Sequence, residues 1–156
     1  MKKLILFLFV FSICITINAQ YEIEKKRFIP EPVKIITIYA GSIILDAIGD
    51  GLCDDGQKTT GHFCQAVSIG MLVASPFILN VDKSKWLWHA MSYVSLRIAL
   101  FDPVYNLTRD LPIDYIGSTS IWDKSLQNFN PPRSAMLWGR SVFLVIGISI
   151  PIKELR

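Results

Sequence analysis

Five side chains of the kinds that bind metals or transfer protons lie in or beside the apolar segments of this sequence. Two are the imidazoles of His62 and His89, and three are the carboxylates of Asp46, Asp50 and Asp102. Together such groups can bind a divalent metal and activate a water molecule for hydrolysis. No spacing among them matches a known metal-ligand motif, so a membrane-embedded metal-dependent hydrolase is one alternative and not the favoured hypothesis. No other cofactor is expected.

Polar side chains recur at every fourth position along two apolar segments, and this spacing places them on one face of a helix. They are Ser42, Asp46 and Asp50 in one segment and His89, Tyr93 and Arg97 in another. Ionisable groups inside a membrane helix usually face the bundle interior and pair with one another. We therefore expect Asp46 or Asp50 to pair with Arg97 or Arg140. The predicted polar network consists of Asp46, Asp50, His89, Tyr93, Arg97 and Arg140.

Three functions compete for this network. In the favoured one, the acids and arginines neutralise each other and fix helix order, and the protein has a non-enzymatic role in assembly. In the second, the network forms the hydrolase site described above. In the third, Asp46, His89 and Arg97 relay protons or bind an ion, as in a small ion- or proton-conducting protein.

Residues 46–57 resemble a calcium loop in part, with Asp at positions one, five and nine and Gly at position six. Ile48 stands at position three and Gln57 at position twelve, where a calcium loop needs oxygen ligands and a bidentate Glu. We instead expect glycines at 49, 51 and 56 to break the helix, leaving Asp54 and Asp55 in water.

The segments that carry these side chains predict four helices, at residues 33–52, 63–81, 86–101 and 130–152. The second has no charged residue and is the strongest membrane-spanning candidate, although Pro76 should kink it. Asp102 and Pro103 are expected to end the third. Asn130 is expected to cap the fourth, with prolines in its first turn.

The first 19 residues have the order of a secretory signal peptide. Lys2 and Lys3 precede an apolar run at 4–17, which is short for a membrane span, and Ala19 supplies a small residue for cleavage. We therefore predict a Sec-type signal at 1–19, a single helical membrane domain at 20–156 and a location in the bacterial cell envelope. In the predicted topology, Cys53 and Cys64 are expected to be free thiols.

Residues 103–130 form a polar connection that contains several aromatic residues, which is unlike a disordered linker. We expect it to lie at the membrane interface, where Ser120 and Asp123 could cap a short helix at 122–128.

The charge composition excludes nucleic acid as an expected partner. The chain has 16 basic and 13 acidic residues, and Lys2 and Lys3 belong to the predicted signal. No basic run follows a phosphate backbone. The expected partners are membrane lipid and, for assembly, a second copy of the chain or other envelope proteins.

The positive-inside rule conflicts with a cleaved signal followed by four spans. That topology puts most basic residues outside, namely Lys25, Lys26, Arg27, Lys34, Lys83, Lys85, Lys153 and Arg156, and leaves Lys58, Arg109, Lys124 and Arg133 inside. An exported soluble helical domain is therefore the structural alternative. The favoured fold is all-α, a small polytopic membrane bundle of about four helices after a cleaved signal peptide.

Overall fold

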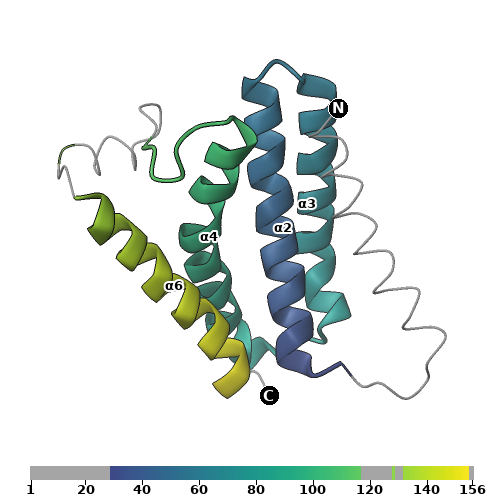
Figure 1. Ribbon diagram of the computed structural model, residues 1–156. Coiled ribbons are helices and arrows are strands. Elements are labelled where there is room, and N and C mark those ends of the chain that lie inside the picture. The colour runs from purple at the N-terminus through teal and green to yellow at the C-terminus, as the bar shows by residue number, and fades with distance from the viewer. Residues whose placement is uncertain (1–28, 117–127, 129–131, 155–156) are drawn as a thin grey trace. The chain divides into compact units, whose positions relative to one another are not determined.

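The computed structural model describes residues 29–116, 128 and 132–154, and its long helices belong to the unit that begins at Glu31. They are α2 (Glu31–Asp54), α3 (Lys58–Ile78), α4 (Trp86–Thr108) and α6 (Arg133–Lys153), and a short 3-10 helix, η1 (Lys83–Lys85), precedes α4 (Figure 1). No strand occurs in these ranges. The prediction of an all-helical bundle of about four helices is confirmed. The signal peptide and the capping box at Ser120 lie outside the described residues.

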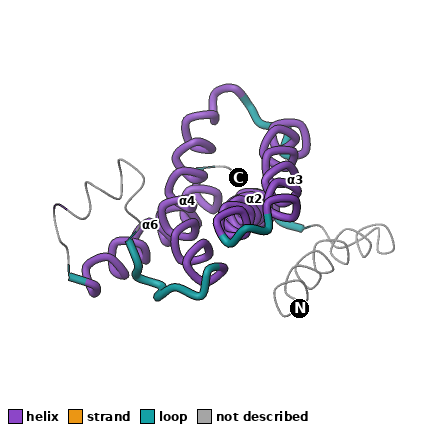
Figure 2. Tube along the Cα trace, turned by 90° about the horizontal axis from the view of Figure 1, so that it is seen from above, coloured by secondary structure: helices purple, strands orange, loops and turns teal. Residues whose placement is uncertain are grey.

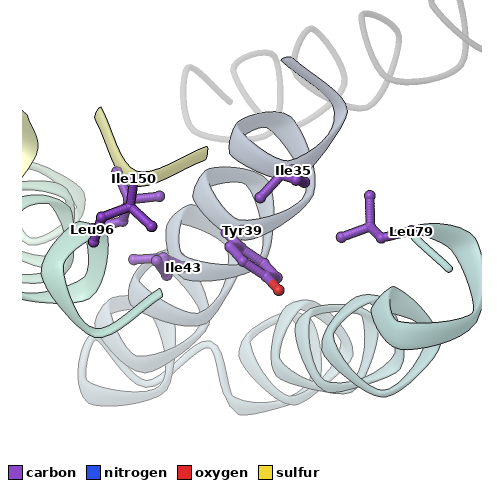
Figure 3. Packing of buried hydrophobic residues seen from close by; sticks show 6 residues of the cluster. All are labelled: Ile35, Tyr39, Ile43, Leu79, Leu96 and Ile150. Atoms are coloured by element: carbon purple, nitrogen blue, oxygen red, sulfur yellow. The ribbon is translucent and has the colours of Figure 1, made fainter. Parts of the chain in front are cut away.

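Helix α2 is the central element of the bundle. It packs against α3 on one side and α4 on the other, and α6 lies against α4 and also touches α2 (Figure 2). The buried apolar cluster centres on α2, which contributes three of its six buried members, as Figure 3 shows. Its buried members are Ile35, Tyr39, Ile43, Leu79, Leu96 and Ile150.

Two glycines expected to break the first helix lie inside it. Gly49 and Gly51 are buried within α2, and only Gly56, with a φ of +84°, lies in the turn to α3. A Cβ atom on Gly49 would approach the carbonyl oxygen of Gly61 to 2.8 Å, and one on Gly51 would approach Thr108 Cβ to 2.9 Å. The break predicted at Gly49 and Gly51 is wrong, because helix packing outweighs a propensity cost of about 1 kcal/mol per glycine.

Helix α4 is longer than the sequence indicates. It contains Pro103 and ends only at Thr108, so the predicted end at Asp102 and the predicted loop start at 103 are wrong. Proline removes one backbone donor, and the contact of Thr108 with Gly51 holds the extra helical turns against α2. In the last turn of the helix, the buried Asn106 side chain donates to the carbonyl oxygens of Ile113 and Tyr115 in the following segment, at 3.3 and 2.9 Å.

The other helix ends differ from expectation by a few residues. Helix α3 begins at Lys58, before the predicted 63, and it ends at Ile78. Helix α6 begins at Arg133, and Pro132 is its N-cap, so that proline precedes the first turn. The expected cap at Asn130 lies outside the described residues.

Three of the described helices, α2, α3 and α6, are long and apolar enough to cross a membrane. We expected four. Helix α4 is not among them because its sequence includes His89, Arg97 and Asp102.

Candidate functional site

The candidate site is a line of polar side chains along α2 with partners on the neighbouring helices. The line runs through Tyr39, Ser42, Asp46, Asp50 and Asp54, at intervals of three or four residues. This spacing keeps the side chains on one side of a helix. Each of the five bonds to a residue of α3 or α4.

Asp46 pairs with Arg97, one of the pairings expected from the sequence. Arg97 Nη1 lies 2.6 Å from Asp46 Oδ2, and the two side chains keep 39% and 22% of their surfaces exposed. The guanidinium also lies over the Phe101 ring, 4.4 Å from its centre. The pair therefore joins α2 to α4 in a half-buried position, with a cation–π contact beside it.

Arg140 belongs to a second ion pair and not to the one on α2. Its Nη2 lies 2.9 Å from Asp102 Oδ2, and its Nη1 donates to the carbonyl oxygen of Ile113 at 2.9 Å. Only 11% of the Arg140 side chain is exposed. This arginine joins α6 to α4 and to the segment that follows α4. Asp102, a catalytic candidate, is thus an ion-pair partner.

His89 forms its hydrogen bond with a residue that sequence reasoning missed. Its Nδ1 lies 2.7 Å from the hydroxyl of Tyr39, across the α2–α4 interface. Tyr93 packs edge-on against Tyr39, with ring centres 5.7 Å apart. The buried histidine and Tyr93 thus meet the same residue of α2. No short motif marks Tyr39, although it lies three residues before Ser42 on the polar side of α2.

We expect Tyr39→Phe to destabilise the protein by about 1–2 kcal/mol, because it leaves the buried imidazole of His89 without its partner. Adding His89→Leu should recover most of this loss, since replacing both partners by apolar groups can be nearly neutral. Unfolding of the purified variants by denaturant, followed by circular dichroism, measures both effects. A double variant less stable than Tyr39→Phe would contradict the pairing.

Asp50 begins a chain of hydrogen bonds that ends at an exposed histidine. The side-chain amide of Gln65 donates to Asp50, and Gln65 Oε1 lies 3.0 Å from His62 Nδ1. Because an ionised carboxylate only accepts, the Gln65 oxygen must face His62 and accept its Nδ1 proton. The neutral His62 ring then has its lone pair on Nε2. Cys53 Sγ lies 3.8 Å from the same Nδ1.

Asp54 continues the α2 line and is 55% exposed, as the sequence predicted, but it is also bonded to residues of the α4 end. The Tyr105 hydroxyl donates to Asp54, and Arg109 donates to that hydroxyl at 2.7 Å and lies 3.6 Å from the carboxylate. The hydrogen bond with Tyr105 raises the pKa of Arg109. The spacing of four from Asp50 could have identified this residue.

Small residues and serines complete the contacts between helices. The Ser42 and Ser68 hydroxyls lie 3.2 Å apart across α2 and α3, and Ser92 donates to the carbonyl oxygen of Gly147 at 2.8 Å across α4 and α6. Leu96 packs directly over Gly147. Close helix approach through small residues, with serine hydrogen bonds, is typical of helices packed within a membrane.

The structure gathers no metal-ligand set in the ranges that it describes. No three His, Cys, Asp or Glu side chains there are grouped so as to hold an ion. Asp46 and Asp50 are helical and bonded to Arg97 and Gln65, so these two residues do not form a loop. Cys53 and Cys64 are free thiols.

Comparison of the chain with protein-family models, curated proteins and solved structures found no match.

Proposed function

We propose that this chain is a small integral membrane protein of the bacterial cell envelope, exported by a Sec-type signal. Its role is non-enzymatic: the interior polar network fixes how the helices pack, and the bundle assembles with itself or with other envelope proteins. The observation that carries the proposal is the extent of exposed apolar surface on the outer helices, together with polar side chains buried beside the apolar core.

Large apolar side chains are exposed on the two outer helices. On α3, Ile69, Val73 and Phe77 repeat every four residues and are 60%, 64% and 80% exposed. On α6, Trp138 and Val145 are 73% and 62% exposed. Monomeric soluble proteins rarely expose continuous apolar surface of this kind, whereas lipid tails would cover it.

Polar side chains, in contrast, lie inside. Ser42 and Ser92 are fully buried, and Asn106 and His89 are 2% and 9% exposed. Among the described residues, every buried side-chain nitrogen and oxygen has a hydrogen-bond partner. A satisfied interior of this kind supports a role in fixing helix order.

The bonding of three of the five catalytic candidates favours a structural role over the two alternatives. Asp46 is held by Arg97, Asp102 by Arg140 and His89 by Tyr39. A hydrolase or a proton relay would need these groups to exchange partners during each cycle. The closed Asp46–Arg97 pair also stands in the middle of the α2 line that a proton would follow.

Membranes are prepared from cells that express a C-terminally tagged chain and are washed with alkaline carbonate. We expect the protein to stay in the membrane pellet. Carbonate releases peripheral and soluble proteins, whereas apolar helices within the bilayer resist extraction because their exposed side chains would enter water. Immunoblotting of the tag in pellet and supernatant, beside a known soluble exported protein, provides the measurement. Release into the supernatant would favour an exported soluble helical domain.

A further inference from the structure

We propose that the turn between α3 and α4 binds the phosphate of an anionic phospholipid headgroup. This inference rests on the proposed membrane insertion and adds the class of lipid and the residues that recognise it. The turn joins the end of α3 to η1 and the start of α4, at the opposite end of α3 from the α2–α3 turn (Figure 1).

Two basic side chains are followed by two aromatic ones in this short segment. Lys83 is exposed and Lys85 half-buried, and Trp86 and Trp88 follow with 59% and 37% of their surfaces exposed. Tryptophan is enriched where a bilayer meets water, and lysines beside it attract anionic headgroups. The sequence alone suggested the interface position of the tryptophans. The structure adds that the lysines form η1 and that the tryptophans lie in the first turn of α4, which follows it directly.

Apolar side chains beside the turn would reach the hydrocarbon. Phe77 and Ile78 end α3 and are 80% and 57% exposed, and Leu87 in the first turn of α4 is 68% exposed. A headgroup held at the lysines would therefore have acyl chains beside exposed apolar surface. A free phosphate ion would gain nothing from these three side chains, which is why we commit to a lipid.

The acid in the turn is engaged with backbone. Asp82 Oδ1 accepts from the N–H of Ser84 at 3.0 Å, and this bond holds the pKa of Asp82 below its usual value. The ionised Asp82 carboxylate offsets one of the two lysines, so the segment keeps one net positive charge at its surface. Helix α4 has no side-chain cap at its N-terminus, so its dipole adds to this charge.

Tryptophan quenching by brominated lipids tests the inference. The chain has four tryptophans, and the changes Trp122→Phe and Trp138→Phe leave Trp86 and Trp88 as reporters in the turn. The full chain is reconstituted in phosphatidylcholine vesicles that contain equal small fractions of either brominated phosphatidylcholine or brominated phosphatidylglycerol. We expect stronger quenching by the anionic lipid. The affinity of the protein for phosphatidylglycerol relative to phosphatidylcholine should fall about five-fold for each lysine removed. The variants are Lys83→Gln and then Lys83→Gln/Lys85→Gln.

Lys58→Gln is the matched control, because Lys58 is an exposed lysine at the other end of α3, about 30 Å away. This variant should keep the full preference for the anionic lipid. Equal quenching by the two lipids, or a preference that survives loss of both lysines, would overturn the inference while leaving membrane insertion supported. Loss of the preference on adding inorganic phosphate at constant ionic strength would also overturn it, in favour of a free anion. Quenching by neither lipid would contradict the insertion itself.

Discussion

Gly61→Ala is expected to destabilise the bundle by about 3 kcal/mol, at the upper end of the usual cost of overpacking. A Cβ atom there would lie 2.6 Å from the carbonyl oxygen of Gly49 and 2.9 Å from the backbone nitrogen of Cys53. Both atoms belong to the backbone of α2, so no rotamer change can relieve the overlap. Helices α2 and α3 would have to separate, and the nearby bond between Gln65 and Asp50 would lengthen or break.

Gly70→Ala provides the control on the same helix. A Cβ atom at Gly70 meets nothing within 4 Å, and alanine is the better helix former by about 1 kcal/mol. The two variants should therefore change stability in opposite directions. The free energy of unfolding of each purified protein in detergent, measured by titration with sodium dodecyl sulfate and circular dichroism, gives the comparison. Equal effects at both positions would mean that α2 and α3 do not approach closely at Gly49 and Gly61.

The helices could be predicted because the hydrophobicity of a segment and the helical spacing of its polar residues are local properties of the sequence. Apolar runs located all four helices, and the spacing of four residues placed Asp46 and Asp50 on the polar side of α2. What failed was the interpretation of glycine and proline. Gly49, Gly51 and Pro103 are helix breakers by propensity, but here they lie within helices that pack closely or are held by bonds to a neighbour.

The choice of partners within the polar network was the harder part to predict. Spacing shows which side chains share a face, but it does not show which neighbouring helix they meet. The sequence therefore left Arg97 and Arg140 as equal partners for the acids of α2. The structure assigns Arg97 to Asp46, and it assigns Arg140 to Asp102 because α6 packs mainly on α4. Tyr39 was missed because a tyrosine in an apolar segment usually indicates core packing alone.

Arg97→Gln is expected to lower stability by about 2 kcal/mol and to reduce the amount of folded protein in the membrane. Loss of one partner from a fully buried ion pair costs about 3–5 kcal/mol because the other charge is left unpaired. The Arg97 side chain is 39% exposed, so a smaller loss applies. Asp46→Asn should have a similar effect, and the double variant should recover part of the loss because no unpaired charge remains. Denaturant unfolding of the four proteins gives the coupling energy between the two positions.

Arg133→Gln is the matched control for this cycle. Arg133 also forms an ion pair, with Nε 2.7 Å from Asp114 Oδ2, but 83% of its side chain is exposed. Only 13% of the Asp114 side chain is exposed, so this variant should lose about 1 kcal/mol, the upper end of the range for exposed pairs and less than Arg97→Gln. If Arg97→Gln folds as well as Arg133→Gln while the cell loses a function that depends on the protein, the Asp46–Arg97 pair is part of a functional site. In that case the network does more than fix helix order, and proton relay at Asp46 becomes the better hypothesis.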